Sequence, residues 1–384
     1  MRTDAAMLAM IFLVCAFMCG CGGSGSGGGN KLTGGTPPAA PTISTAAAQN
    51  GAVIVTLADA SPSTIIYYTV DGSTPTASSQ QYLAPFLVAS SLTVNAIAIS
   101  GASDPLEVST VATQTFTLNI PSGTLVWSDE FTSSSSTPAQ PNPAVWTYDT
   151  GAGGWGNDEL EDYCGWTSTD PNCSSTSPSE YVAAYPGTDG VLYVVAQQPS
   201  PGVYTSARLK TQGLFSFQYG RIEFRAMVPE AQGFWPANWL LGNNIATVNW
   251  PACGEMDVLE RVNAPGTPLD WNEGSVHGTG FTGGTGLGTQ YNFPSGQTAA
   301  QWHTYDMVWS NGTVSYSIDG NTYANYTPSS LTPLNDGAVW PFDAGQANFI
   351  ILNLAVGGDY PGSPDSSTPF PSEMLVDYVR IYTN

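Results

Sequence analysis

The sequence predicts an all-β protein built from two β-sandwiches, a small one followed by a large one. The chain is rich in turn-forming residues, with 42 Gly and 29 Pro among 384 residues, and only 10% of its residues are charged. Few residues therefore favour helices. Short apolar or alternating segments recur along the chain, and no window shows the period of an amphipathic helix. Together these features favour strands joined by turns.

Residues 43–120 are expected to form an immunoglobulin-like module. Within the last of its strand-like segments, Phe116, Leu118 and Ile120 alternate with polar residues and share one strand face. Several short strands in a segment of this length are typical of an immunoglobulin-like sandwich. The strand-like segments are 53–57, 65–70, 92–99 and 115–120.

Residues 121–384 are expected to form one larger sandwich. Ile222, Phe224 and Ala226 alternate with charged residues, as in a half-buried strand. Asp319-Gly320 is a turn signal between two further strands. A single β-domain of this length is large but allowed. The strand-like segments are 124–127, 191–196, 221–228, 256–260, 305–309, 314–318, 349–356 and 375–382.

Positive charge is scarce. The chain has 8 Lys and Arg against 30 Asp and Glu, a formal net charge of −22, and the module at 43–120 has neither Lys nor Arg. Binding to nucleic acid or to an anionic membrane surface requires cationic side chains. The composition therefore excludes both as partners and favours an uncharged one.

The first residues are interpreted as an export signal. The apolar run 5–18 is too short to span a bilayer and fits the core of a signal peptide over 1–20. Gly20-Cys21 resembles a bacterial lipoprotein processing site, because a small residue precedes the cysteine that would be lipidated. Residues 21–42 are a Gly/Ser/Pro linker. We expect an exported cell-envelope protein held to a membrane only through lipid on Cys21; ordinary signal cleavage and secretion is the alternative.

The cysteines beyond the leader agree with export. Cys164 and Cys173 lie in one loop rich in Gly, Thr and Pro, where a disulfide is permitted in an oxidising compartment. Cys253 is then left over and is expected to be a small buried apolar residue.

The segment from Glu255 to Glu260 carries the most informative pattern. Glu255 and Asp257 are two residues apart and share one face of a strand, whereas Glu260 has the wrong parity. A β-bulge at Val258-Leu259 would turn Glu260 to the same side. Clustered carboxylates cannot all ionise near neutral pH, and a protonated and an ionised carboxyl together can hydrolyse a glycosidic bond. A solvated acidic edge and a calcium site are the alternatives.

At these residues the chain resembles a known family. E-M-D-V-L-E, preceded by W-P-A-C-G, is similar to the active-site strand of glycoside hydrolase family 16, in the bulged form of its laminarinase-like members. The resemblance implies a β-jelly-roll of the concanavalin A type for the larger domain. Upstream, IIYYTVDGSTPTASSQQY resembles the C-terminal module of chitobiases, and a spacer role is favoured there over sugar binding. Further blocks that match the family are 125–131, 204–242, 275–284 (taken as the following loop), 302–309, 351–362 and 374–382.

The resemblance implies roles for the carboxylates. Glu255 would be the nucleophile, Glu260 the acid and base, and Asp257 the residue that hydrogen-bonds the nucleophile. The implied activity is a retaining endo-β-1,3-glucanase acting on a neutral β-glucan, with no cofactor for catalysis and a monomer as the default. Mixed-linkage β-1,3-1,4-glucan is an alternative substrate, and sulfated galactans fit the cation-poor chain less well. A non-catalytic glucan-binding protein is the alternative from another class.

The resemblance also implies binding residues. For each tryptophan a core role is the alternative, for Arg208 a salt bridge, and for His277 a structural role; His303 is expected to be structural. The positions matched to substrate binding are Asn157, Arg208, Trp235, Trp239, Trp250 and His277. A structural calcium ion, remote from the active site, is matched to Glu130, the backbone of Gly190, and Asp377, whose parity places it on an inward face with Leu375, Val379 and Ile381.

Overall fold

The computed structural model describes residues 36–384 except 101–106, 175, 265–269, 333–336 and 344. The predicted signal peptide, the lipidation site at Cys21 and most of the linker lie outside the described residues. None of the helices described is long and apolar enough to cross a membrane.

The first module is a sandwich of two antiparallel sheets. Inward side chains of both sheets, among them Val55, Tyr68 and Val94, form its core. Tyr68 is buried while its neighbour Tyr67 is only partly so, as the opposite faces of a strand require. One sheet contains β1 (Thr42–Ala47), β2 (Val53–Ala58) and β5 (Phe86–Val88); the other contains β4 (Gln80–Gln81), β3 (Thr64–Thr69), β6 (Leu92–Ser100) and β7 (Ala112–Phe116).

The last strand of this module is shorter than predicted. β7 ends at Phe116, so the strand predicted to reach Ile120 is too long, although Leu118 packs against the same core as Phe116. The main chain of Leu118 bonds to a side chain instead of a neighbouring strand: its N–H and C=O both meet Ser91 Oγ, at 2.9 and 2.8 Å. Alternation in the sequence cannot distinguish a backbone that pairs with a neighbouring strand from one that bonds to a side chain.

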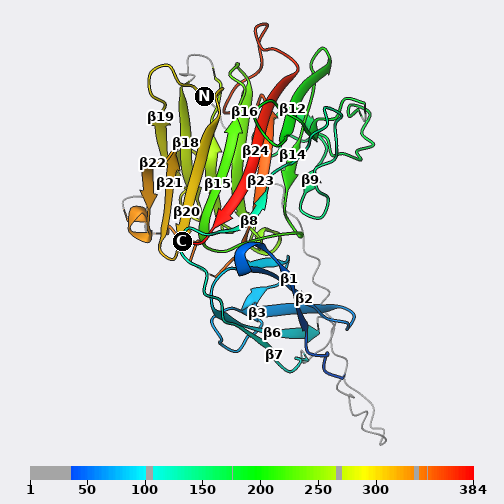
Figure 1. The fold of residues 1–384 in the computed structure, drawn as a ribbon, viewed down its shortest axis with the longest axis vertical. Coiled ribbons are helices and arrows are strands. Elements are labelled where there is room, and N and C mark those ends of the chain that lie inside the picture. Colours follow the sequence, from blue (N-terminus) through cyan, green and yellow to red (C-terminus); the bar gives the residue numbers. More distant parts are fainter. Residues whose placement is uncertain (1–35, 101–106, 175, 265–269, 333–336, 344) are drawn as a thin grey trace, which may run out of the picture. The chain divides into compact units, whose positions relative to one another are not determined.

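The larger domain contains a seven-stranded and a ten-stranded sheet (Figure 1). The seven-stranded sheet runs in the order β19 (Leu287–Asn292), β18 (Trp271–His277), β17 (Glu255–Glu260), β16 (Phe234–Gly242), β23 (Asn348–Val356), β14 (Arg208–Lys210) and β9 (Thr147–Asp149). The main path of the ten-stranded sheet is β10 (Glu161–Tyr163), β13 (Val203–Ser206), β12 (Val191–Ser200), β24 (Ser372–Tyr382), β15 (Gly220–Met227), β20 (His303–Ser310), β21 (Thr313–Ile318) and β22 (Asn321–Tyr326), with β11 (Glu180–Ala183) beside β12 and β8 (Leu125–Asp129) beside β24.

Inward side chains of both sheets form one core. Ile222, Phe224 and Ala226 of β15 are fully buried and face Leu240, Met256 and other apolar residues of the seven-stranded sheet. All eight segments predicted as strands in this domain are strands, and Asp319-Gly320 joins β21 to β22. The described helices are short: α1 (Ile245–Val248) and the 3-10 turns Gln49–Gly51, Gly283–Thr285 and Pro328–Leu331. The predicted all-β fold with an immunoglobulin-like first module is confirmed.

The cysteines behave as the sequence allowed. Cys164 and Cys173 are joined by a disulfide, and Cys253 is a buried free thiol. The boundary between the two domains at residue 120 stays a prediction, although the strands of the first module end at Phe116 and those of the second begin at Leu125.

Candidate active site

β17 contains the bulge that the sequence predicted. Asp257 pairs with Ser275 and Glu260 with Glu273, so three steps along β17 match two along β18. On its other side, β17 slips by one residue against β16 at the same place. Val258 and Leu259 both enter the core, and the parity of the strand changes there. As a result, Glu255, Asp257 and Glu260 all lie on the outer face of the seven-stranded sheet, here called the site face.

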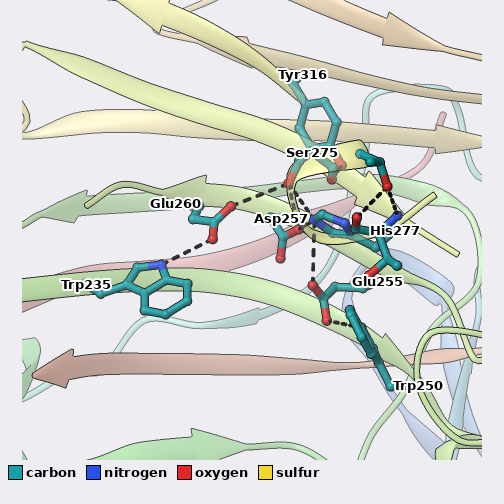
Figure 2. Close-up of polar contacts among 10 residues, drawn as sticks. Trp235, Trp250, Glu255, Asp257, Glu260, Ser275, His277 and Tyr316 are labelled. Carbon is teal, nitrogen blue, oxygen red and sulfur yellow. Dashed lines mark hydrogen bonds and ion pairs between the residues drawn. The ribbon is translucent and has the colours of Figure 1, made fainter. Parts of the chain in front are cut away.

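The three carboxylates share a small set of polar neighbours (Figure 2). Ser275 Oγ donates to Asp257 Oδ2 at 2.8 Å and lies 3.5 Å from Glu260 Oε2. His277 Nε2 lies 3.3 Å from Asp257 Oδ2 and 3.9 Å from Glu255 Oε1. Asp257 is therefore the centre of the cluster, and β18 supplies the groups that connect it to the two glutamates.

Two tryptophans flank the cluster from opposite ends (Figure 2). Trp235 Nε1 donates to Glu260 Oε1 at 3.2 Å, and Trp250 Nε1 donates to Glu255 Oε2 at 3.0 Å. Trp235 comes from β16, whereas Trp250 lies in the loop before β17 and is exposed. Neither ring belongs to the core, so both keep faces on which a sugar ring can stack.

The surroundings of the two glutamates differ electrostatically. Burial and the adjacent Asp257 raise the pKa of both carboxyls. For Glu255, the Trp250 N–H and Arg208 oppose this rise, while for Glu260 the carboxylates of Glu255 and Glu273 add to it. The charge of His277 opposes the rise for both carboxyls, and the pKa of each reaches about 8, so the two glutamates stay closely matched and share the same tendency to hold a proton.

His277 is placed to act as a cation. Burial alone would lower its pKa, but the hydrogen bond and charge of Asp257, with the charges of Glu255 and Glu260, raise the pKa of His277 to about 9. An imidazolium at this position offsets part of the negative charge of the cluster. His277 lies beside two of the carboxylates, and its role in substrate binding stays a prediction.

Arg208 connects the carboxylate cluster to the next strands of the sheet. Its guanidinium lies 4.8 Å from the ring centre of Trp239 and 5.4 Å from that of Trp155. Its Nε also lies 3.1 Å from Asp149 Oδ2, so the salt bridge considered as the alternative is present. The ion pair and the two rings together hold the guanidinium on the site face.

Asn157 reaches the site through a chain of hydrogen bonds. Its Nδ2 donates to Glu159 Oε1 at 3.0 Å, and Tyr163 OH donates to Glu159 Oε2 at 2.9 Å. Asn353 Nδ2 donates to Tyr163 OH at 3.2 Å, and Asn353 Oδ1 accepts from Trp239 Nε1 at 2.7 Å. These hydrogen bonds connect Asn157 to Trp239 and not directly to the three carboxylates. His303, in contrast, is buried and bonds to Asp319 and Thr298, as expected of a structural residue.

Several residues at the site were missed from the sequence. The sequence predicts a loop over 275–284, but Ser275 and the predicted site residue His277 end strand β18, which also carries Glu273 on the same face. The sequence carried no clear alternation that could have found Glu273 and Ser275, because Asn272 and Gly274 are not apolar and Ser275 is itself buried. Asn353 carried no such signal either, because it lies in a strand buried throughout.

Glu255, Asp257 and His277 are also the described residues whose side chains could jointly hold a metal ion, with one donor atom of each within 4.8 Å of the others. Both carboxylates already have partners from Trp250 and Ser275. These three side chains are therefore suited to holding and transferring protons, and we assign no metal ion or cofactor to them.

The residues matched to calcium are engaged by arginines. Glu130 accepts hydrogen bonds from Arg380 Nε and Nη2 at 2.9 and 2.8 Å, and Asp377 accepts one from Arg225 Nη1 at 2.5 Å. A cation would have to displace both guanidinium groups from these oxygens. The arrangement does not fit the calcium site, which stays an untested prediction.

The expectation that Asp377 points inward is wrong. The pairing of β24 with β15 shifts between Val376 and Tyr378, so that Asp377 is the extra residue of a bulge. Val376 before the bulge and Val379 after it both enter the core. Asp377 is left partly buried beside Arg225.

Gly190 has a structural reason that does not involve a metal. At its positive φ of +135°, a side chain would clash with the backbone of Phe131 and Ser133.

Comparison with known proteins agrees with this geometry. Residues 44–110 match the chitobiase/beta-hexosaminidase C-terminal domain, and residues 172–369 match glycosyl hydrolases family 16. The chain is 37% identical over 270 residues to a beta-glucanase of Rhodothermus marinus, which covers 67% of this chain and 84% of that protein. It is 33% identical over 288 residues to glucan endo-1,3-beta-glucosidase A1 of Niallia circulans, covering 67% of this chain and 37% of that protein.

Solved structures give the same result. The laminarinase catalytic domain of Thermotoga maritima matches with a TM-score of 0.57 and 36% identity, covering 69% of this chain and 99% of that domain. The carboxylates on one face of the bulged strand β17 agree with this similarity, which extends over nearly all of the laminarinase catalytic domain. The chain belongs to glycosyl hydrolases family 16.

Proposed function

We propose that this protein is a retaining endo-β-1,3-glucanase of the laminarinase type. The observation that carries the proposal is the bulge of β17, which places Glu255 and Glu260 on one face, on either side of Asp257. The relatives whose names specify a 1,3-β-glucan linkage support the choice of substrate. Retaining hydrolysis requires the two carboxyl groups to lie about 5–5.5 Å apart, and carboxyls that flank one shared neighbour are compatible with that spacing.

In the proposed reaction, Glu255 attacks the anomeric carbon and forms a glycosyl-enzyme ester. Glu260 gives its proton to the departing glycosidic oxygen. Glu260 then removes a proton from water, which attacks the ester, releases Glu255 and gives a product of retained configuration. The charge of His277 offsets part of the negative charge of the cluster during these steps, and Ser275 donates a hydrogen bond to Asp257.

The charges of the site support a neutral polymer as substrate. Arg208 and Lys210 on the site face both pair with Asp149. An anionic polysaccharide would need cations that have no such internal partner. Trp235, Trp239 and Trp250 offer the aromatic surface that pyranose rings require.

The decisive measurement is the release of reducing ends from laminarin, with proton NMR of the first product formed. We expect the β-anomer to appear first and to mutarotate later. Glu255→Gln should lower the rate at least about 10³-fold, because the nucleophile is lost, with little change in the midpoint of thermal unfolding.

Parallel assays on lichenan and agarose separate the alternatives within the family. A higher rate on lichenan than on laminarin would replace the proposal with a mixed-linkage glucanase. Binding of laminarin without release of reducing ends would indicate a glucan-binding protein. Hydrolysis by Glu255→Gln at the wild-type rate would contradict the assignment of the nucleophile.

A further inference from the structure

The bulge of β17 is held by a buried side-chain amide. Asn272 lies on the inward face of β18 and is fully buried. Its Oδ1 accepts from the backbone N–H of Glu260 at 3.2 Å, and its Nδ2 donates to the backbone C=O of Val258 at 3.2 Å. The two bonds span the inserted residue. A bulge disrupts the regular pairing of the strands, and here one side chain contacts a main-chain group on each side of the disruption.

Two tyrosines of the opposite sheet contact the neighbouring main chain of β18. Tyr316 OH donates to the C=O of Ser275 at 2.6 Å, and Tyr326 OH donates to the C=O of Gly274 at 3.2 Å. Both rings are buried. Asn272, Tyr316 and Tyr326 thus form a polar group inside the apolar core, here called the bulge brace.

The absence of a side chain at Gly274 makes room for these rings. A Cβ there would lie 2.8 Å from Tyr316 Cγ and 2.5 Å from Tyr323 OH. Tyr323 OH in turn lies 3.3 Å from Asn272 Nδ2. Buried polar groups that are satisfied in this way make one backbone arrangement strongly preferred over others.

We propose that the bulge brace is a positioning device for Glu260, and that Asn272 fixes the acid on the site face without touching the substrate. The inference rests on the proposed function, because it assumes that Glu260 is the acid. Without the bonds from Asn272, the inserted residue is free to shift along β17, and a shift by one residue would turn Glu260 towards the core. Removing the side chain of Asn272 would therefore weaken proton donation by Glu260 and leave sugar binding unchanged.

A leaving-group comparison tests this inference. The probes are laminarin and 2,4-dinitrophenyl β-laminaribioside, whose leaving group departs without a proton. For Asn272→Leu we expect kcat/KM on laminarin to fall about 10²-fold or more, and kcat/KM on the aryl glycoside to fall less than about threefold. Tyr316→Phe should show the same selectivity with a smaller loss, and it carries the test if Asn272→Leu does not fold.

The fold supplies matched controls. Asn238 is a fully buried asparagine on β16, on the other side of β17, whose amide has no hydrogen-bond partner among the described residues. Tyr305 on β20 is a buried tyrosine whose hydroxyl likewise lacks a partner in the described part of the chain. Asn238→Leu and Tyr305→Phe should keep both activities within about twofold of the wild type.

Glu260→Gln separates this inference from the proposed function. If Glu260→Gln shows no dependence on the leaving group, the role of Glu260 as acid fails. If Glu260→Gln shows that dependence but Asn272→Leu and Tyr316→Phe lose equal activity on both probes, or lose none, the positioning role of the bulge brace is overturned.

Discussion

Glu273 is the cross-strand partner of Glu260 and shares its face of the sheet. Its charge is one of the causes that raise the pKa of Glu260, after burial, Asp257 and Glu255. Glu273→Gln removes this charge and keeps the shape of the side chain. The pKa of Glu260 should then fall, so that the acid loses its proton at a lower pH. We expect the alkaline limb of the pH profile of kcat/KM on laminarin to shift to lower pH.

Glu373→Gln is the control for that measurement. Glu373 is an exposed carboxyl on β24, outside the site, and its replacement should leave the alkaline limb in place. An unshifted limb in Glu273→Gln, with the control behaving as expected, would show that Glu273 does not tune the acid.

Individual residues could be predicted from the sequence where parity and chemistry agreed. Strand parity placed Glu255 and Asp257 on one face and a bulge was needed to bring Glu260 to it, whereas the roles of the three carboxylates came from the resemblance to the family. Ser275 was missed, because its segment was read as a loop. The ion pair between Arg208 and Asp149 could not be predicted from the sequence, because the two residues are remote in the chain and meet only through the pairing of β14 with β9.

Strand β18 is supported by tight packing at one glycine. A methyl group at Gly274 would overlap the ring of Tyr316 and the hydroxyl of Tyr323 in the opposite sheet. Gly274→Ala should therefore lower the free energy of unfolding by about 1–3 kcal/mol, as expected when a core is overfilled. Urea unfolding measures this change. Gly284→Ala, where a methyl group would meet nothing within 4 Å, should have little effect, and equal stability of both variants would contradict the packing argument.

Strands were predicted well where a hydrophobic alternation was long, and badly where a bulge or a side-chain contact interrupted it. The bulge of β17 was anticipated because three carboxylates needed one face. The bulge of β24 at Asp377 had no such chemical signal, and the predicted orientation of Asp377 was wrong for that reason. The end of β7 at Phe116 depended on Ser91, which is remote in sequence.

The stability of the molecule should depend on pH through a buried carboxyl outside the site. Glu180 of β11 is buried, and neither of its oxygens has a partner among the described residues. Burial raises the pKa of Glu180 to about 9. Between its value of about 4.3 in the unfolded chain and that value, only the unfolded state loses the proton, so stability falls as pH rises.

Glu180→Gln should remove this penalty. Relative to the wild type, the free energy of unfolding of the variant should increase from pH 5 towards pH 8, by at most about 1.4 kcal/mol per pH unit. The difference between the two proteins should be independent of pH below about pH 4, where both states are protonated. A difference that stays constant from pH 5 to pH 8 would show that Glu180 is ionised in the folded protein.

We also propose that the whole chain is exported and anchored through lipid on Cys21. Expressed in full length in a bacterial host, the wild type should fractionate with membranes, and Cys21→Ser should not, because a lipidated cysteine is the anchor. Release of both proteins into the soluble fraction would favour ordinary cleavage of the signal peptide.

All the cations of the described residues have acidic partners, and this has a consequence for where the protein can go. Arg208 and Lys210 pair with Asp149, Arg221 with Asp306, Arg225 with Asp377, Arg261 with Glu230 and Arg380 with Glu130. The remaining carboxylates surround the molecule with a negative field of about 8–10 Å range at moderate ionic strength. A gel of acidic polysaccharides would exclude such a protein by the Donnan effect. Added salt would screen this repulsion and let the protein enter the gel. A neutral glucan inside a mixed matrix would then become accessible without any change in the active site.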